Sequence, residues 1–387
     1  MINFQFNMPT RILFGRDTHH AVGETTRLYG KKVLLHYGRS SIKESGLYET
    51  IVGSLRNARV DFLELSGVQP NPRLSLVRQG IDMCKGNGID FLLAVGGGSV
   101  IDSAKAIAAG SLYDGDVWDF FERKAELERS MPVGVVLTIA AAGSESSCGA
   151  VVTKEEGWLK RDIVHECLRP KFAILNPELT VTLPDYQLAC GICDMMAHIF
   201  ERYFTNVEDV DLTDGLCEAA LRSIVRNGAS VMRNKANYAA QAEIMWAGTL
   251  AHNDLLGTGR EGDWASHNIE HELSGIYDIA HGAGLSIVFP AWMKHVYRHN
   301  PRRFEQFAVN VWDVDYACAK QDQTILEGIA RMEGFFRKIG LPTRLGEANI
   351  ATDRFDEMAR KATHNGPLGI FAKLTQEDIV EIFRLAV

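Results

Sequence analysis

The sequence predicts an α/β domain with a mostly parallel sheet, followed by an all-α domain. In the first half, short apolar runs alternate with helical patterns, which is typical of a parallel sheet covered by helices. From Pro184 onward, strand-like runs nearly vanish and helical periods continue to Val387. A chain of 387 residues with 46% hydrophobic content can bury two substantial cores. We therefore expect domains of residues 1–183 and 184–387, closely packed with a cleft between them.

The strands of the first domain are predicted by apolar runs that each end in a turn or polar segment. The runs are KKVLLHYG (31–38), VDFLELSG (60–67), IDFLLAVGGG (89–98), MPVGVVLTIA (131–140) and PKFAILNP (170–177). Apolar residues at helical spacing, followed by Gly or Asn, predict helices between the strands. These segments are SGLYETIVGSLRNA (45–58) and NPRLSLVRQGIDMCKGNG (71–88).

Composition narrows the class of protein. The formal net charge is -8 with acidic and basic residues interspersed, so no basic surface for nucleic acid or an anionic membrane is expected. The cysteines are odd in number and lack paired spacing, which indicates reduced thiols; they are Cys84, Cys148, Cys167, Cys190, Cys193, Cys217 and Cys318. We interpret the C-x-x-C pair at 190 and 193 as helix residues. No signal-peptide pattern or apolar run of about twenty residues occurs, so we expect a cytoplasmic protein.

Four side chains have the types and spacings of a divalent metal site. Asp194 and His198 are four residues apart, so on a helix both project from one face. His267 and His281 are fourteen apart, and we expect the chain to fold back near Gly275 and Asp278. Three imidazoles and one carboxylate suit zinc or ferrous iron better than calcium or magnesium, which prefer oxygen ligands.

Two other interpretations of these residues stay open at this point. An aspartate and a histidine four apart on a helix are more often a solvated face than a metal site. In addition, His267, Glu270 and His271 spell H-x-x-E-H, the inverted zinc peptidase motif. The peptidase interpretation is disfavoured because short motifs match by chance and other segments of the chain indicate a nucleotide.

Glycine-rich and hydroxyl-rich turns follow two of the predicted strands. In AVGGGSVIDSAK, Gly97, Gly98 and Ser99 lead into a helix, and their backbone N–H groups can receive a pyrophosphate. The segment is not G-x-G-x-x-G, because position 101 is Ile, nor is it a P-loop. In LTIAAAGSESSCGAV, small and hydroxyl residues again follow a strand; they are Thr138, Gly143, Ser144, Ser146 and Ser147. A lone glycine cluster can be structural, but two such turns predict a dinucleotide site.

In combination, these motifs resemble the iron-containing alcohol dehydrogenase family. The resemblance rests on GGGSVIDSAK, on TIAAAGSE, on Asp194 with His198, and on His267, His271 and the HGAG around His281. It covers essentially the whole chain. The segments GVQPNP, LYDGDVWDF and REGDWASHNIEHELSGIYDIAHGAG look like the butanol dehydrogenase branch, which acts on short primary alcohols and aldehydes.

The resemblance implies a dinucleotide domain and a helical metal domain in a layout like that of dehydroquinate synthase. It implies that Asp194, His198, His267 and His281 bind the metal. The nucleotide contacts that we expect include Asn71, Asp102, Thr138, Ser147, Lys160 and Leu179. Two positions depart from the family pattern, since Ala142 stands where Thr is common and Ser147 where the branch often has Asn.

The expected chemistry is hydride transfer between a nicotinamide and a small alcohol or aldehyde. A divalent ion would polarise the substrate oxygen. We predict His271, one helical turn from His267, as the catalytic residue that passes a proton between the substrate oxygen and solvent. A histidine that is merely satisfied within its helix is an equal alternative for His271.

The turn after the first predicted strand favours NADP(H) over NAD(H). It contains no carboxylate, whereas Gly38, Arg39, Ser40 and Ser41 offer a guanidinium, two hydroxyls and backbone donors to a 2'-phosphate. Arg39 could instead be solvent exposed without a ligand. Glu44 is the nearest acid in sequence and should face away from the turn inside the next helix.

Two other functions are weighed against a dehydrogenase. A lyase like dehydroquinate synthase should surround its substrate with basic and polar residues, whereas Trp264, Ile269 and Tyr277 near the ligands favour a small uncharged substrate. A nucleotide-binding protein without activity would have no use for the ligand set. We also expect a homodimer, because an edge strand within MINFQFNMPTRILFG could pair across a twofold axis, although such a strand can equally be covered within one chain.

Overall fold

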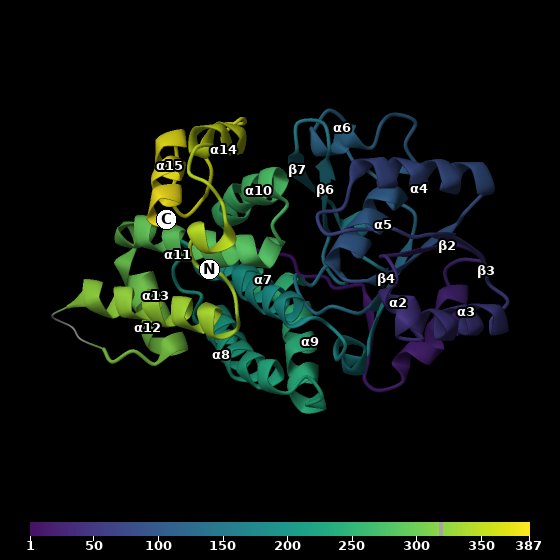
Figure 1. Ribbon diagram of the computed structural model, residues 1–387, viewed down its shortest axis with the longest axis horizontal. Coiled ribbons are helices and arrows are strands. Elements are labelled where there is room, and N and C mark those ends of the chain that lie inside the picture. The colour runs from purple at the N-terminus through teal and green to yellow at the C-terminus, as the bar shows by residue number, and fades with distance from the viewer. Residues whose placement is uncertain (317–319) are drawn as a thin grey trace. The chain divides into compact units, whose positions relative to one another are not determined.

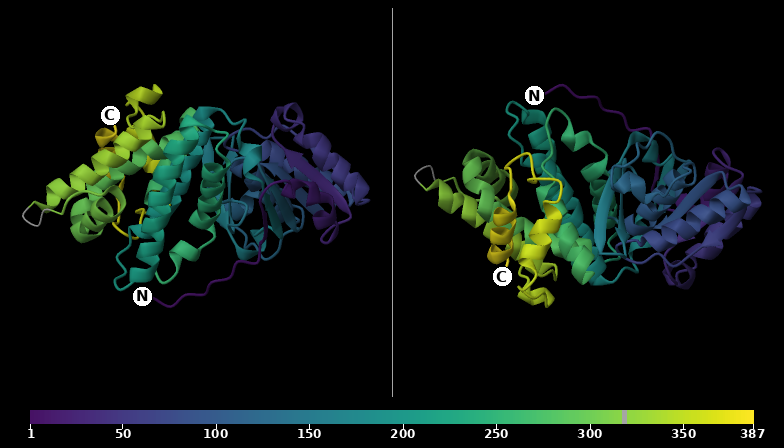
Figure 2. Two further views of the ribbon diagram at one scale, coloured as in Figure 1. Left: turned by 90° about the horizontal axis from the view of Figure 1, so that it is seen from below. Right: turned by 90° about the horizontal axis from the view of Figure 1, so that it is seen from above.

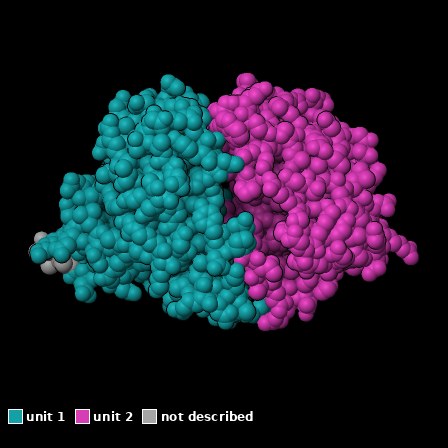
Figure 3. All heavy atoms as spheres, viewed as in Figure 1, with its two compact units in different colours: residues 1–6, 184–387 teal, residues 7–183 magenta. Residues whose placement is uncertain are grey.

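The computed structural model describes residues 1–316 and 320–387, so Cys318 lies outside the described residues. The chain forms two compact units, which Figure 3 distinguishes by colour. An α/β unit comprises residues Asn7–Leu183, and a helical unit comprises Pro184–Val387 together with Met1–Phe6. The amino-terminal residues therefore belong with the second unit, although we expected them in the first domain.

The α/β unit is built on a six-stranded parallel sheet with the order β1-β8-β5-β4-β2-β3. Its strands are β1 (Arg11–Phe14), β2 (Lys32–Tyr37), β3 (Asp61–Leu65), β4 (Phe91–Gly96), β5 (Val133–Leu137) and β8 (Phe172–Leu175) (Figure 1). Every residue of β4, β5 and β8 is buried. This burial explains why continuous apolar runs predicted the strands correctly, because helices cover both faces of such a sheet.

A two-stranded antiparallel hairpin of β6 (Gly149–Lys154) and β7 (Leu159–Val164) was not predicted. Its strands are only partly buried, and the polar run Lys160–Asp162 interrupts the apolar pattern of β7. Gly157 and Trp158 turn the chain between the strands with φ angles of 78° and 50°. A half-buried hairpin gives no long apolar run, so pattern alone did not reveal it.

The predicted helices of residues 45–58 and 71–88 are confirmed as α3 and α4. The helices of the unit are α1 (Val22–Arg27), α2 (Ser41–Glu44), α3 (Leu47–Asn57), α4 (Leu74–Asn87), α5 (Gly98–Gly110) and α6 (Trp118–Phe121), with 3-10 helices η1 (Thr18–Ala21), η2 (Glu166–Leu168) and η3 (Pro177–Thr180). α4 stops at Gly88, whose φ of 63° is the left-handed conformation that glycine adopts at helix ends.

The amino-terminal segment is extended, and Figure 2 shows it as a trace without helices before the first strand. The amino group of Met1 donates to the carbonyl of Glu208 at 2.8 Å, and the amide of Ile2 donates to the carbonyl of Gly259 at 3.0 Å. Only Arg11–Phe14 of the predicted edge strand forms β1, which pairs with β8. These backbone contacts are long-range in sequence, which is why local pattern did not predict them.

The second unit is helical, as predicted. Its helices are α7 (Asp185–Tyr203), α8 (Asp211–Arg233), α9 (Tyr238–His252), α10 (Ala265–Tyr277), α11 (His281–Val296), α12 (Pro301–Trp312), α13 (Gln321–Lys338), α14 (Phe355–Ala362) and α15 (Gln376–Leu385), with η4 (Leu255–Gly257), η5 (Tyr297–His299) and η6 (Gly346–Ala348). α8, α9 and α11 pack against α7 (Figure 1). All residues of α7 from Leu188 to Tyr203 are buried, so α7 is the central helix of this unit.

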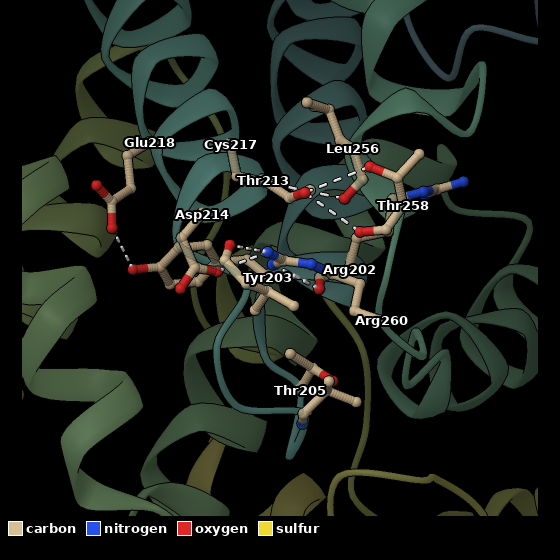
Figure 4. A network of polar contacts seen from close by, with 12 residues as sticks. Arg202, Tyr203, Thr205, Thr213, Asp214, Cys217, Glu218, Leu256, Thr258 and Arg260 are labelled. Carbon is tan, nitrogen blue, oxygen red and sulfur yellow. Dashed lines mark hydrogen bonds and ion pairs between the residues drawn. The ribbon is translucent and has the colours of Figure 1, made fainter. Parts of the chain in front are cut away.

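Buried charges tie the carboxyl end of α7 to its neighbours (Figure 4). Asp214 of α8 forms an ion pair with Arg260 at 2.7 Å, and the hydroxyl of Tyr203 donates to Glu218 at 2.8 Å. Arg260 also donates to the carbonyl of Arg202 at 3.3 Å. Because removing one partner would leave an uncompensated buried charge, this network holds the end of α7 in place.

Within the described residues, no helix combines the length and apolar character that a membrane span requires.

Candidate active site

The predicted metal ligands Asp194 and His198 lie on the central helix α7 and are both buried. The Nδ1 atom of His198 is 2.9 Å from the backbone carbonyl of Asp194 and 3.1 Å from its carboxylate Oδ1. The spacing of four residues therefore places both side chains on the same face of the helix, as expected. That face is inside the protein, so the solvated-face interpretation of this pair is wrong.

His267 and His281 lie on consecutive helices. α10 continues through Gly275 to Tyr277, and the chain reverses at Asp278, whose φ of 52° is left-handed. α11 then begins at His281. The expected break at Asp278 is present, but Gly275 is inside α10 and does not contribute to it. The reversal brings the first residue of α11 back to the histidine face of α10.

The structure gathers the predicted ligands into one cluster within the helical unit. Candidate ligand atoms of Asp194, His267 and His281 all lie within 4.8 Å of one another. The ring of His198 is 4.5 Å from the ring of His267, measured between centroids. Side chains from α7, α10 and α11 thus converge, although they are up to 87 positions apart in sequence (Asp194 to His281).

The three imidazoles use their Nδ1 atoms for hydrogen bonds. His198 Nδ1 faces the carbonyl of Asp194, His267 Nδ1 is 2.7 Å from Glu201 Oε1, and His281 Nδ1 contacts Glu270 Oε2. With the proton on Nδ1, each ring keeps an Nε2 lone pair. This is the arrangement in which a neutral imidazole binds a metal.

His267 gives the clearest evidence that the cluster fits a metal ion. Its Nε2 atom is buried and has no hydrogen-bond partner within the described residues. Leaving such an atom unsatisfied costs about 1–3 kcal/mol, which a metal ligand bond would offset. Burial and the neighbouring imidazoles lower the pKa of His267 well below its usual value, so the ring is neutral. Neutral imidazole is the form that metals require.

The structure also argues against a peptidase interpretation of H-x-x-E-H and a redox interpretation of C-x-x-C. The carboxylate of Glu270 accepts from Ser274 and contacts His281 Nδ1, so both of its oxygens are engaged and it is not available as the base of an inverted zinc peptidase. Cys190 and Cys193 are buried on α7 as free thiols, and burial raises the pKa of both, that of Cys190 to about 12. Neither cysteine has the lowered pKa of a reactive redox pair.

His271 is buried on α10 beside the cluster, and its ring centroid is 5.7 Å from that of His281. Candidate ligand atoms of His271, Glu270 and His281 also lie within 4.8 Å of one another. His271 is therefore close enough to the cluster for the proton-transfer role predicted for it, which stays a prediction.

The supporting carboxylates Glu201 and Glu270 were not predicted from sequence. Their spacing contains a signal that could have revealed them, because Asp194, His198 and Glu201 stand at i, i+4 and i+7 on one helix face. Likewise, Glu270 is three residues after His267. Burial raises the pKa of Glu201, whereas hydrogen bonds from the amides of His267 and Trp264 oppose that shift.

In the α/β unit, the strand order brings the predicted nucleotide turns together. In the sheet, β3 pairs with one side of β2, and β4, the next strand in sequence, pairs with the other side of β2. Ligands of open parallel sheets bind beyond the carboxyl ends of the strands at such a reversal. The turn of residues 38–41 follows β2, the turn of residues 97–99 follows β4, and Thr138 follows β5. These three segments end neighbouring strands at one edge of the sheet.

Gly97 and Gly98 differ in the space that surrounds them. A Cβ at Gly97 would lie 2.9 Å from the side chain of Ile139, so packing alone requires glycine there. A Cβ at Gly98 would meet nothing within 4 Å. Gly98 begins α5, so the open space lies at the positive end of a helix. These residues fit a phosphate group bound by backbone N–H donors.

Other predicted coenzyme residues lie in more varied settings. Arg39 is exposed and lies 3.5 Å from Gln69 Oε1. Asn71 is buried after β3 with a φ of 53°, and Lys160 is buried in β7. Leu179, in η3, packs against the core of the α/β unit. These placements neither require nor preclude coenzyme contacts.

Asp102 and Ser147 already take part in a polar network. Asp102 accepts hydrogen bonds from Ser144 Oγ at 2.6 Å and from the amide of Val151 at 3.0 Å. Ser147 is buried, and Lys105 Nζ lies 3.2 Å from its hydroxyl. Asp102 and Ser147, which we predicted as nucleotide contacts, therefore also stabilise the turn after β5.

Lys105 is the centre of this network, and sequence reasoning missed it. It is fully buried on α5, and its ammonium donates to the carbonyls of Ser147 at 2.9 Å and Gly149 at 2.8 Å. Burial lowers its pKa to about 8, and the charge of Asp102 opposes the shift. The signal in the sequence was a lysine three residues after Asp102, in a helix whose following residues to Gly110 are all small or apolar.

Comparisons with known proteins show the family of this chain. A family model described as iron-containing alcohol dehydrogenase matches residues 9–177, and one described as the C-terminal part of the Fe-containing alcohol dehydrogenase family matches residues 188–387. The chain belongs to the iron-containing alcohol dehydrogenase family. The resemblance predicted from the motifs is thereby confirmed, and the protein is an oxidoreductase that acts on alcohols.

Relatives in this family match over the full length. The chain is 44% identical over 384 residues to the probable NADH-dependent butanol dehydrogenase 1 of Bacillus subtilis (strain 168), with 99% of both chains covered. It is 33% identical over 369 residues to the NADPH-dependent aldehyde reductase YqhD of Escherichia coli (strain K12), which covers 95% of this chain and 94% of that one.

A solved structure confirms the fold. The crystal structure of NADH-dependent butanol dehydrogenase A from Thermotoga maritima matches with a TM-score of 0.97 and 39% identity, covering 100% of this chain and 99% of that one. Family membership implies a metal and a nucleotide coenzyme, and it favours a dehydrogenase over the lyase that we considered.

Proposed function

We propose that this protein interconverts short primary alcohols, such as butanol, and the corresponding aldehydes, with NADP(H) as the preferred coenzyme. The observation that carries the proposal is the buried His267 Nε2, which faces a cluster of ligand atoms without a hydrogen-bond partner in the described part of the chain. Butanol dehydrogenases are among the relatives that match over the full length.

In this proposal, Asp194, His198, His267 and His281 hold one Fe²⁺ or Zn²⁺ ion. The bound ion supplies Lewis acidity toward the substrate oxygen. The chain's own contribution is to orient the ligand side chains and to bury most of them, which limits the access of water to the reacting groups. Beside them lies the ring of Trp264, 5.3 Å from that of His267, an apolar neighbour that suits a small uncharged substrate.

We assign to His271 the transfer of a proton between the substrate oxygen and solvent. Its support is its position, buried and next to His281 and Glu270. Hydride transfer leaves a proton to be removed in the oxidative direction and to be supplied in the reductive one. An imidazole suits both directions because its unperturbed pKa is near neutrality.

The coenzyme is proposed to bind at the carboxyl edge of the parallel sheet. Gly97, Gly98 and Ser99 would receive the pyrophosphate through backbone N–H groups, supported by the open space at Gly98. The remaining contacts are proposed for Asn71, Asp102, Thr138, Ser147, Lys160 and Leu179.

The preference for NADP(H) rests on the turn after β2. Gly38, Arg39, Ser40 and Ser41 include no carboxylate that would repel a 2'-phosphate. On the neighbouring strand β3, Glu64 accepts hydrogen bonds from the hydroxyls of Tyr37 at 2.7 Å and Tyr48 at 2.6 Å, so both of its oxygens are already engaged. Relatives at 39–44% identity are named NADH-dependent, whereas the aldehyde reductase at 33% is named NADPH-dependent, so the proposed preference rests on this turn and not on the names of relatives.

A homodimer is proposed from the amino-terminal region. Ile2, Phe4, Phe6 and Phe14 are exposed apolar side chains, and β1 is an edge strand that pairs only with β8 in the described sheet. Exposed apolar residues and an unpaired strand edge each favour association with a second copy. Sedimentation of a Phe4→Asp, Phe6→Asp double variant tests this, because a monomer is expected where the parent protein sediments as a dimer.

The proposed activity is tested by mixing the purified protein with NADPH and butyraldehyde and following the loss of NADPH absorbance. We expect turnover by the parent protein and by His364→Ala, which removes an exposed histidine from the same unit. We expect neither turnover nor full metal content in His267→Ala. Full metal occupancy in His267→Ala would contradict the ligand assignment, and an inactive but metal-loaded parent would contradict the substrate class.

A further inference from the structure

Two buried carboxylates lie directly behind the proposed metal ligands. Glu201, near the carboxyl end of α7, is 1% exposed, and Glu270, in the middle of α10, is 0% exposed. Ionised carboxylates are costly to bury unless their charge and hydrogen-bonding capacity are satisfied. Their positions therefore need an explanation in terms of what they contact.

Glu201 controls both the backbone and the ring of His267. Its Oε1 accepts from the amide of His267 at 3.1 Å and contacts the ring Nδ1 at 2.7 Å, while Oε2 accepts from the amide of Trp264 at 2.6 Å. Trp264 is the residue before α10 and supplies no side-chain cap. Glu201 thus caps the first turn of α10 from a different helix and orients the histidine in that turn.

Glu270 links α10 to the start of α11. Its Oε2 contacts His281 Nδ1, and its Oε1 accepts from the hydroxyl of Ser274. A Cβ at Gly284 would lie 2.5 Å from Glu270 Oε1, so glycine at this position makes room for the carboxylate. Gly284, the second glycine of the HGAG segment, therefore has a specific role, which is to let Glu270 reach His281.

We infer that Glu201 and Glu270 are positioning residues that fix the tautomer and ring direction of His267 and His281 and thereby strengthen metal binding. The inference rests on the proposed function, in which these histidines hold the metal. A carboxylate that accepts the Nδ1 proton leaves Nε2 as the ligand atom and makes it more basic.

The first test measures metal affinity directly. The dissociation constant for Zn²⁺ is measured by competition with a chelator in the parent, Glu201→Gln and Glu270→Gln proteins. We expect each variant to bind about 10–100-fold more weakly, which is the usual effect of removing such partners. Glu218→Gln is the matched control, since Glu218 is a buried carboxylate of the same unit that accepts from Tyr203 and Asn310, away from the ligands.

The outcomes separate this inference from the proposed function. If the parent protein does not bind Zn²⁺ or Fe²⁺, the proposed metal site is wrong. If the parent binds metal and both variants bind it as tightly as Glu218→Gln, the positioning role is wrong while the metal site stands. Because Glu201 also caps a helix, loss of folding in Glu201→Gln leaves Glu270→Gln to decide the question.

A second readout distinguishes positioning from a merely structural role. In zinc-loaded protein with ¹⁵N-labelled histidine, NMR should show Nδ1-protonated rings for His267 and His281. The His267 nitrogen shifts should change in Glu201→Gln and the His281 shifts in Glu270→Gln. Gly284→Ala, which displaces the Glu270 carboxylate without altering charge, should weaken Zn²⁺ binding in the same direction as Glu270→Gln. Unchanged ring shifts in both glutamine variants would overturn the inference.

Discussion

The α/β unit and the helical unit present their candidate functional groups in different ways. In the α/β unit, backbone donors at the ends of β2 and β4 face the proposed coenzyme site, and open space at Gly98 is the key observation. In the helical unit, side chains on α7, α10 and α11 converge on one point, and those of Asp194 and His267 are buried. The proposed coenzyme site depends on turns and helix ends. The proposed metal site depends instead on further side chains that hold the ligand side chains in place.

This difference predicts that the two sites can be damaged independently. The largest effect is expected for His281→Ala, which removes a proposed ligand. Metal content should fall from one ion per chain to nearly none, and kcat/KM should fall by about 1000-fold, equivalent to about 4 kcal/mol of transition-state stabilisation. The Kd for NADPH, measured by fluorescence titration, should stay within about twofold of the parent value. A large loss of coenzyme affinity would show that the two sites are not independent.

The α/β unit should also have its own dependence on pH. His36 is fully buried on β2, where its ring nitrogens contact the carbonyl of Leu65 and the hydroxyl of Ser103 at 2.9 Å. Burial lowers its pKa from 6.5 to about 4. Below pH 6.5 the unfolded chain binds a proton that the folded chain does not, so His36 makes folding less favourable as pH falls to 4, by about 3 kcal/mol in total.

The measurement is urea unfolding of the α/β unit within the full chain at several pH values. In His36→Gln, the part of the acid destabilisation that arises from this ring should disappear, and the curve of unfolding free energy against pH should be flatter between 6.5 and 4. His20→Gln, which changes an exposed histidine, should keep the slope of the parent. Equal slopes in the parent and His36→Gln would show that His36 does not carry this dependence.

A smaller effect is expected for Gly98→Val. The added side chain would fill the open space at the start of α5, and NADPH should bind about 10–100-fold more weakly because charge-assisted bonds to phosphate are lost. Metal content should not change. Gly86→Val is the matched control, because Gly86 also has nothing within 4 Å of a Cβ but lies in the last part of α4. Parent-like affinity in Gly98→Val would place the phosphate site elsewhere.

The smallest effect is expected for Arg39→Ala. The ratio of kcat/KM for NADPH to that for NADH on the same aldehyde should fall by about tenfold, the value of one exposed charge-assisted contact. NADH kinetics should be nearly unaffected. If the parent already used NADH as well as NADPH, the proposed preference would be wrong. If the ratio did not change in the variant, Arg39 would not be its cause.

Much of the architecture was predictable from the sequence because burial leaves a local signature. The strands β4, β5 and β8 are apolar throughout, and the histidines and the aspartate of the candidate metal site have recognisable spacing. The half-buried hairpin of β6 and β7 has no such signature. The attachment of Met1 and Ile2 to the helical unit was equally hidden, since it uses backbone groups distant in sequence.

The supporting residues show a second limit of sequence reasoning. Glu201, Glu270 and Lys105 are charged residues within helices, which from sequence alone are expected on solvated faces. Only the packing of α7 against α10, or of α5 against the turn after β5, shows that they are buried and what they hold. Helical spacing from a proposed site residue is the feature that could have identified them earlier, since Glu201 is seven residues after Asp194, Glu270 three after His267 and Lys105 three after Asp102.

The central claim is that Asp194, His198, His267 and His281 bind one divalent metal ion inside the helical unit. Anomalous X-ray diffraction from crystals of the metal-loaded protein, collected above and below the iron and zinc absorption edges, tests it most directly. We predict one strong anomalous peak per chain within about 2.0–2.2 Å of His267 Nε2 and of an Asp194 carboxylate oxygen. A peak held by other residues, or none in an active preparation, would contradict the claim.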